Sequence, residues 1–209
     1  MTPPPDPPRT LAIEEVRTRL LDGTLVLVRP IRPDDKPLLR EGFERLSDES
    51  RLRRFMAPIS ELDDDQLSYL TEVDYVNHFA WVAALADRPD FGIGVGRYIR
   101  LKDDPEVAEV AITVVDAYQG KGLGTLLLGM LAATARVAGV RKFRAYVLED
   151  NLPMRTLLSQ LGVETRHDAP GVLVMDAEID PARLPDSPAG QALKAIARRL
   201  LPAKARVEM

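Results

Sequence analysis

The residues best suited to chemistry lie in one short segment, Val114 to Thr125, which joins an apolar strand to a helix. Three glycines, Gly120, Gly122 and Gly124, are spaced two apart within it. Side chains at these positions would block a ligand, so the spacing predicts backbone N–H groups turned toward an anion. The helix expected to follow, from about Leu123 to Val137, would direct the positive end of its dipole at the same place. The segment therefore predicts a phosphate-binding turn.

Two familiar phosphate-binding motifs do not match this segment. A P-loop requires Ser or Thr after its Gly-Lys pair, but Gly122 follows Lys121 here. A dinucleotide fingerprint requires G-x-G-x-x-G, and the third interval between these glycines is wrong. The pattern that fits is Q-x-x-G-x-G, at Gln119, Gly122 and Gly124. A tight turn that needs positive φ would also explain the glycines, so a purely structural interpretation stays open for the turn taken alone.

This motif, together with the preceding strand from Ala108 to Val115, resembles the acyl-CoA-binding signature of the GNAT N-acetyltransferases. The likeness covers about residues 21–180 and extends to Leu25–Arg32 with Asp34-Asp35, the strand Lys142–Leu148, Asn151-Leu152-Pro153-Met154, and Leu161-Gly162-Val163. The resemblance implies an α+β protein with the GNAT fold. It implies a central mixed, mostly antiparallel twisted sheet of about six to seven strands, flanked by helices. It also implies acetyl-CoA as the cosubstrate and no metal.

Acetyl transfer to an amine needs a base, because a lysine-like amine has an unperturbed pKa of about 10.4 and is mostly protonated at neutral pH. Glu109 is the best candidate for this general base. It lies on the strand that enters the turn, among apolar neighbours, where we expect its carboxylate to be partly shielded from water. An exposed strand charge is the alternative interpretation of Glu109. Glu106 is the reserve candidate, and Asp116 is interpreted as structural.

The resemblance also implies roles for the residues around the turn. The main chain at Val114 and Val115 would bind the pantetheine arm and the thioester carbonyl. The diphosphate would be held by the turn and the helix start, namely Gln119, Gly120, Lys121, Gly122, Leu123 and Gly124, with the hydroxyl of Thr125. Asn151 would hydrogen-bond the cosubstrate. Many family members carry a tyrosine general acid seven residues after this asparagine, where this chain has Leu158, so no general acid is assigned.

Leu158, the Asn-Leu-Pro-Met phrase and the Ala108–Ala111 strand look like the catalytic domain of bacterial protein lysine acetyltransferases of the Pat type. This likeness implies direct attack by a lysine on a metabolic enzyme, and a stand-alone catalytic unit. The acidic segment Glu61–Asp65 would attract a lysine-bearing surface, or would simply hold solvated acids at a helix start. A small-molecule amine acetyltransferase and a non-catalytic acyl-CoA-binding sensor remain the alternatives. Acceptor identity, acyl-chain preference and oligomeric state stay open.

Composition argues against several other classes of protein. The chain of 209 residues has no cysteine and only two histidines, which argues against disulfides, a thiolate nucleophile and a metal site. Its net charge of −4 argues against nucleic acid as a partner. No apolar stretch approaches the roughly 18 residues of a spanning helix, and the N-terminus lacks a signal-peptide core. We therefore expect a cytoplasmic protein without a membrane partner.

The pattern of apolar residues divides the chain into three parts. Residues 1–10 are expected to be a disordered Pro-rich arm, 11–180 the acetyltransferase domain, and 181–209 a linker with a basic amphipathic helix. Helices are expected at 11–21, 34–46 (capped by Asp34), 47–56, 63–75, 123–137 and after Asn151; strands are expected at 24–32, 79–86, 91–101, 107–115, 142–148, 163–166 and 172–178. Gly92, Gly94 and Gly96 predict a strand whose small face allows a neighbour to approach closely.

Overall fold

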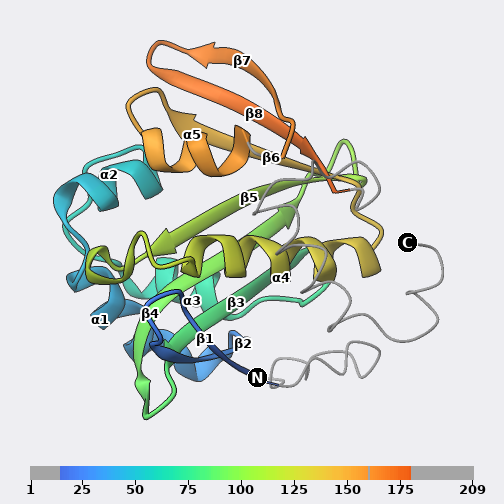
Figure 1. The fold of residues 1–209 in the computed structure, drawn as a ribbon. Helices are drawn as coiled ribbons and strands as arrows, with labels where there is room; N and C mark the ends of the chain where they lie inside the picture. The colour runs from blue at the N-terminus through green and yellow to red at the C-terminus, as the bar shows by residue number, and fades with distance from the viewer. Residues whose placement is uncertain (1–14, 160, 180–209) are drawn as a thin grey trace. The chain divides into compact units, whose positions relative to one another are not determined.

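The computed structural model describes residues 15–159 and 161–179, which are coloured along the chain in Figure 1. The strands are β1 (Val16–Arg19), β2 (Leu25–Pro30), β3 (His78–Leu85), β4 (Arg88–Arg100), β5 (Val107–Val114), β6 (Lys142–Leu148), β7 (Glu164–Ala169) and β8 (Val172–Glu178). The helices are α1 (Lys36–Glu44), α2 (Asp48–Phe55), α3 (Asp64–Thr71), α4 (Leu123–Val137) and α5 (Leu152–Ser159), with 3-10 turns η1 (Pro33–Asp35) and η2 (Asp116–Tyr118).

These strands form a mixed sheet in the order β1-β2-β3-β4-β5-β6-β8-β7. The pair β5 and β6 is parallel, whereas β1 with β2, β2 with β3, β6 with β8, and β7 with β8 are antiparallel. The predicted α+β class with a mostly antiparallel sheet is confirmed, with eight strands in place of the expected six to seven. The expected arm and C-terminal helix lie outside the described residues.

The chain divides into two compact units, and the boundaries between them fall within β4, β5 and α4. The first unit holds the residues up to Arg97 together with Ile112–Gly124. The second holds Tyr98–Ala111 and the residues from Thr125 onward. Within residues 15–159 and 161–179, none of the helices is both long and apolar enough to cross a membrane.

Strands β2 and β3 supply the core of the first unit. They pair from Val26 opposite Leu85 to Pro30 opposite Trp81. All of β3 after its first residue is buried, which is typical of a strand covered on both faces. Helices α1 and α3 contact each other and bury leucines in the same unit. Gly92 on β4 lets α1 come close, because a Cβ there would lie 2.5 Å from Leu38 Cδ2. The predicted close approach of a neighbour is therefore confirmed at Gly92.

The expected helix over residues 11–21 is wrong in its described part. Residues Val16–Arg19 form β1, which pairs antiparallel with β2 from Val16 opposite Val28 to Arg19 opposite Leu25. The weak helical spacing competed here with β-branched Val16 and with the open edge of an apolar strand, and strand pairing prevailed. Pairing that depends on a partner elsewhere in the chain leaves no local signal.

The expected cap at Asp34 is also wrong. Helix α1 begins after η1 with Asp35 as its N-cap residue, and the carboxylate of Asp35 does not cap the helix. Both of its oxygens instead pair with Arg29, at 2.6 and 2.7 Å, and one accepts the Arg32 N–H at 2.7 Å. This hydrogen bonding raises the pKa of Arg29 above its ordinary value.

The second unit is built around β6, whose residues alternate between half-buried and buried positions. Strand β5 pairs in parallel with β6 over Val107–Glu109, and β6 pairs with β8 along its whole length. Figure 1 shows β7, in orange, alongside β8. All residues of β7 are exposed. Arg144 on β6 forms a two-bond ion pair with Asp176 on β8, at 2.8 and 2.9 Å.

Candidate functional site

The glycine-rich turn lies between β5 and α4, as the sequence predicts. Gly120 and Gly122 have φ angles of 71° and 86°, in the left-handed region that favours glycine. Gly124 lies inside α4. A Cβ at Gly122 would also approach Leu21 Cγ to 3.1 Å. The backbone thus requires two of the three glycines, and the turn delivers the chain directly to the N-terminus of α4. The first N–H groups of such a helix have no acceptor within it and can bind an anion.

A chain of hydrogen bonds orders the residues just before this turn. The Gln119 side-chain amide donates to the Val114 carbonyl at 3.1 Å and to the Ser50 hydroxyl at 3.2 Å. The Ser50 hydroxyl in turn donates to the Asp116 carboxylate at 2.9 Å. Gln119, the first residue of the motif, therefore fixes the end of β5 and connects it to α2.

Asp116 hydrogen-bonds to the start of α2, which is distant from it in the sequence. Its carboxylate accepts the Ser47 N–H at 3.0 Å and the Ser47 hydroxyl at 2.8 Å, and Ser47 is the N-cap residue of α2. Although partial burial acts to raise the pKa of Asp116, the hydrogen bonds from Ser47 and Ser50 lower it below its ordinary value. The structural role expected for Asp116 is found, at α2 rather than at its own turn.

The main chain at Val114 and Val115 is only partly available to a ligand. The Val115 N–H donates to the Ile93 carbonyl at 3.0 Å, and the Val115 carbonyl accepts the Tyr118 N–H at 2.8 Å. Backbone groups of successive strand residues alternate in direction, so the Val114 N–H points to the opposite edge of β5. Of the two N–H groups, that of Val115 already has an acceptor, on β4.

Lys121 is held by the turn between β1 and β2. Its ammonium lies 3.0 Å from the Asp22 carboxylate and 5.1 Å from the centre of the Tyr118 ring. Hydrogen bonds from Thr24, and then the one from Lys121, lower the pKa of Asp22 to about 2. The Leu21 N–H donates to the Lys121 carbonyl at 3.0 Å. Lys121 is thus a half-exposed cation with an acidic neighbour.

The other predicted site residues, Glu109, Thr125 and Asn151, belong to the second unit. Glu109 is exposed on β5, so the expected shielding from water is not found. It is the last residue of β5 in the register with β6, opposite Arg144. Arg144 pairs with Asp176, and Glu109 makes no ion pair within the described residues.

Thr125 and Asn151 both lie at helix starts. Thr125 is half-buried in the first turn of α4. Asn151 directly precedes α5, and its side-chain oxygen accepts the Met154 N–H at 3.2 Å. This is the contact of an N-cap residue, which leaves the amide nitrogen of Asn151 pointing away from the helix backbone.

Leu158 and Glu106 have structural roles. Leu158, at the position where related enzymes have a tyrosine, is 2% exposed on α5 and packs in the core. Glu106 pairs with Arg141 at 3.1 Å, and its carbonyl accepts the N–H groups of Arg141 and Lys142. Glu106 therefore fixes the start of the β5–β6 pair.

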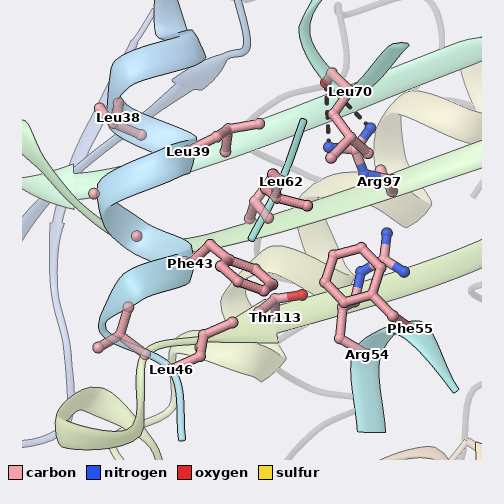
Figure 2. Close-up of a pocket in the computed structure, with 15 residues that line it drawn as sticks. Leu38, Leu39, Phe43, Leu46, Arg54, Phe55, Leu62, Leu70, Arg97 and Thr113 are labelled. Carbon is pink, nitrogen blue, oxygen red and sulfur yellow. Dashed lines mark hydrogen bonds between the residues drawn. The ribbon is translucent and has the colours of Figure 1, made fainter. Parts of the chain in front are cut away.

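Sequence reasoning missed a cavity in the first unit, shown in Figure 2. Its volume is about 60 Å³, and its walls come from α1, α2, α3, β4 and the end of β5. The lining is mostly apolar but includes Arg54, Arg97 and Thr113. An arginine within the apolar run of residues 91–101 is the one signal in the sequence that could have indicated it.

Arg97 is buried, with 3% of its surface exposed. Both terminal nitrogens donate to the Leu70 carbonyl at 3.2 Å, and one lies 2.8 Å from His78 Nε2. Since arginine only donates, His78 accepts at Nε2 and is neutral, with its hydrogen on Nδ1. Burial and the positive charge of Arg97 lower the pKa of His78 to about 4.

Comparison with known proteins agrees with this arrangement. The family model described as "Acetyltransferase (GNAT) domain" matches residues 26–164. The chain is 34% identical over 169 residues to the acetyltransferase Pat of Mycolicibacterium smegmatis, covering 81% of this chain and 50% of that protein. It is 33% identical over 148 residues to an acetyltransferase of Pseudomonas aeruginosa, covering 70% and 79%.

A solved structure is also similar along most of the chain. The crystal structure of the GNAT domain of S. lividans PAT superposes with a TM-score of 0.73 at 33% identity, covering 78% of this chain and 96% of that one. The present chain thus matches nearly the whole of that domain, but spans half the length of the M. smegmatis protein.

Proposed function

The chain belongs to the GNAT acetyltransferase family and is an N-acetyltransferase, and we propose that it transfers the acetyl group of acetyl-CoA to a lysine side chain of another protein. The observation that carries the cosubstrate proposal is the turn at Gly120 and Gly122. Its two left-handed residues lead into the unpaired N–H groups of α4, an arrangement suited to a diphosphate.

The diphosphate would be held by main-chain donors from Gln119 to Gly124, with the Thr125 hydroxyl as a further donor. Lys121 would add a positive charge, shared with Asp22. Asn151 has a side-chain nitrogen that its helix does not use, and this group would donate to the cosubstrate.

The thioester would lie along the edge of β5. The Val114 N–H points to that edge, whereas the Val115 N–H is occupied by Ile93. We therefore assign the oxyanion contact to Val114. Gln119 holds the Val114 carbonyl and so fixes the orientation of this peptide.

Glu109 would act as the general base, directly or through water. It removes a proton from the ammonium of the acceptor, and the amine nitrogen then attacks the thioester carbon. A C–N bond forms, the C–S bond breaks, the CoA thiolate leaves, and the new amide nitrogen releases its second proton to solvent. The thiolate takes its proton from solvent. Leu158, which stands where related enzymes have a tyrosine, has no acidic proton and is buried. The support for Glu109 is its position on the strand that supplies Val114, together with a carboxylate that no described cation occupies.

A protein lysine as the acceptor is supported by the acidic surface of the first unit. Glu61, Asp64 and Asp65 are exposed at the start of α3, where they would attract a cationic partner. The similarity to Pat points in the same direction. The physical requirement is only a primary amine, so a small amine acceptor is the second form of the proposal.

The proposal is tested with Glu109→Gln, which keeps the shape of the side chain and removes the base. We expect amine-dependent CoA release to fall by about 10²–10⁴-fold, the usual contribution of a general base, while acetyl-CoA binding stays unchanged. Glu106→Gln is the matched control, because Glu106 pairs with Arg141 and should leave the rate nearly intact. Full activity in Glu109→Gln would remove Glu109 from the mechanism. Intact-mass analysis of candidate proteins and amines, after incubation with acetyl-CoA and the enzyme, identifies the acceptor.

A further inference from the structure

The lining of the cavity in the first unit includes a buried cation, Arg97. Arg54 and Arg97 are in its lining, and no aspartate or glutamate is. Figure 2 shows the guanidinium of Arg54 pointing toward Arg97. Burial of Arg97, and then repulsion from Arg54, lower the pKa of Arg97 to about 9, so the guanidinium still carries its charge at neutral pH.

Neutral partners only partly compensate for burying this charge. The Arg97 guanidinium contacts the Leu70 carbonyl and His78 Nε2, and its Nε has no hydrogen-bond partner in the described structure. An unpaired buried cation is costly, and proteins usually pair it. An anion in the cavity would supply the missing counter-charge.

Thr113 adds a second unsatisfied group to the same cavity. Its hydroxyl is buried and also has no hydrogen-bond partner among the described residues. Two buried polar groups with an unsatisfied atom, Arg97 and Thr113, thus line a mostly apolar space. A ligand that combines an anionic end with an apolar stem would satisfy both parts of the lining.

We propose that this cavity binds a carboxylate carried on a short apolar stem, with Arg97 as the counter-charge and Thr113 as a hydrogen-bond donor. The volume of about 60 Å³ suits such a group. One water-sized probe fills about 10–15 Å³, so the space holds about four to six atoms of that size. A carboxylate on a stem of two or three carbons has about this size.

The cavity borders the segment that would hold the thioester. Thr113 and Val115 line it, and they lie on either side of Val114 in the sequence. Given the proposed function, on which this step rests, the carboxylate has two possible sources. It belongs either to the acyl group, as in a succinyl thioester, or to an acceptor that carries a carboxylate near its amine.

The first test measures binding without turnover. Butyrate and its uncharged counterpart butyramide are titrated into the intact chain, and chemical-shift changes in its NMR spectrum are followed. We expect butyrate to bind at least tenfold more tightly, since hydrogen bonds to a charged group exceed neutral ones by about this factor. Equal binding of the two probes would overturn the proposal.

Two variants assign the effect to the cavity. Arg97→Met keeps the stem and removes the charge, so it should abolish the preference for butyrate. Thr113→Val removes only an unsatisfied hydroxyl, so it should fold normally and weaken butyrate binding severalfold. Arg40→Met, at an exposed ion pair with Asp64, and Thr71→Val, at the last residue of α3 and outside the cavity lining, are the matched controls. A preference that survives in both cavity variants would also refute the assignment.

The second test identifies the source of the carboxylate. Succinyl-CoA is compared with butyryl-CoA using one amine, and 4-aminobutyrate is compared with its amide using acetyl-CoA. A preference that depends on Arg97 in the first pair assigns the acyl group, and one in the second pair assigns the acceptor. Absence of both would refute a substrate role. If the proposed function itself were wrong, no turnover would occur with any pair while the butyrate titration stayed positive.

Discussion

The two left-handed glycines of the turn offer a quantitative test of how the site is built. Alanine in this conformation costs about 1–2 kcal/mol, because its Cβ crowds the following carbonyl oxygen. Alanine also restricts the unfolded chain, which offsets about 0.5–1 kcal/mol of that cost. Gly120→Ala should therefore destabilise the protein by about 1 kcal/mol, since a Cβ at Gly120 meets no atom within 4 Å.

Gly122→Ala should cost slightly more than Gly120→Ala. Its Cβ would lie 3.1 Å from Leu21 Cγ, so Leu21 has to move by a few tenths of an ångström. Leu21 is 84% exposed and can move easily, so the additional cost stays below about 1 kcal/mol. Gly42→Ala is the control with the opposite sign, because Gly42 lies inside α1 with open space around its Cβ. It should stabilise the protein by about 0.5–1 kcal/mol.

Urea denaturation measures all three values, with unchanged slopes as the check that only stability has moved. Calorimetry with acetyl-CoA then separates fold from function. A Cβ at Gly120 touches nothing in the protein, so a tenfold or larger loss of affinity in Gly120→Ala would arise from the ligand's side of the turn. If Gly120→Ala were as stable as the wild type and bound acetyl-CoA equally well, the strained turn would not be the diphosphate site.

Two further predictions follow from polar contacts of the first unit. His78 is neutral in the fold, with its pKa lowered from 6.5 to about 4, so stability is fully present above pH 6.5 and is lost as pH falls toward 4. Between pH 7 and 4.5 the wild type should lose about 2 kcal/mol more than His78→Gln in urea denaturation, and equal losses would contradict the assignment. Asp116→Asn should weaken the anchoring of α2 by about 1 kcal/mol, because the hydrogen bonds from Ser47 and Ser50 lose their charged acceptor. Its acetyl-CoA affinity should fall only a few-fold, and a change confined to affinity would count against a structural role.

Local signals explain why the sequence predicted most of the fold. Strand β6 and helix α4 were located to the residue, since the first alternates strictly and the second follows three glycines with a long apolar run. Ser47 and Asp63 begin their helices as capping residues should. Strand β1 is not predicted, because it forms by pairing with β2 and its own residues carry no local signal of that pairing.

The site divides in the same way. The turn could be predicted, because positive φ leaves a visible mark as glycine. The chain of hydrogen bonds that joins Asp116, Ser50 and Gln119 could not be predicted. Asp116 and Ser50 are 66 residues apart, and serine has no distinctive sequence pattern. The cavity was missed for a related reason. From the sequence alone, Arg97 would be interpreted as a solvent-facing strand residue, because its contact with the Leu70 carbonyl of α3 leaves no local signal.

The two proposed subsites share β5 yet can be perturbed separately, because strand geometry sends their groups in different directions. The side chains of Thr113 and Val115 line the cavity, whereas the contact assigned to Val114 is a backbone N–H at the edge of the strand. Thr113→Val alters neither that N–H nor the Gln119 contact that orients it. A protein with this variant should therefore bind acetyl-CoA normally while losing affinity for a carboxylate. Joint loss of both would mean that the cavity and the thioester edge are one site, and that Arg97 acts on the cosubstrate itself.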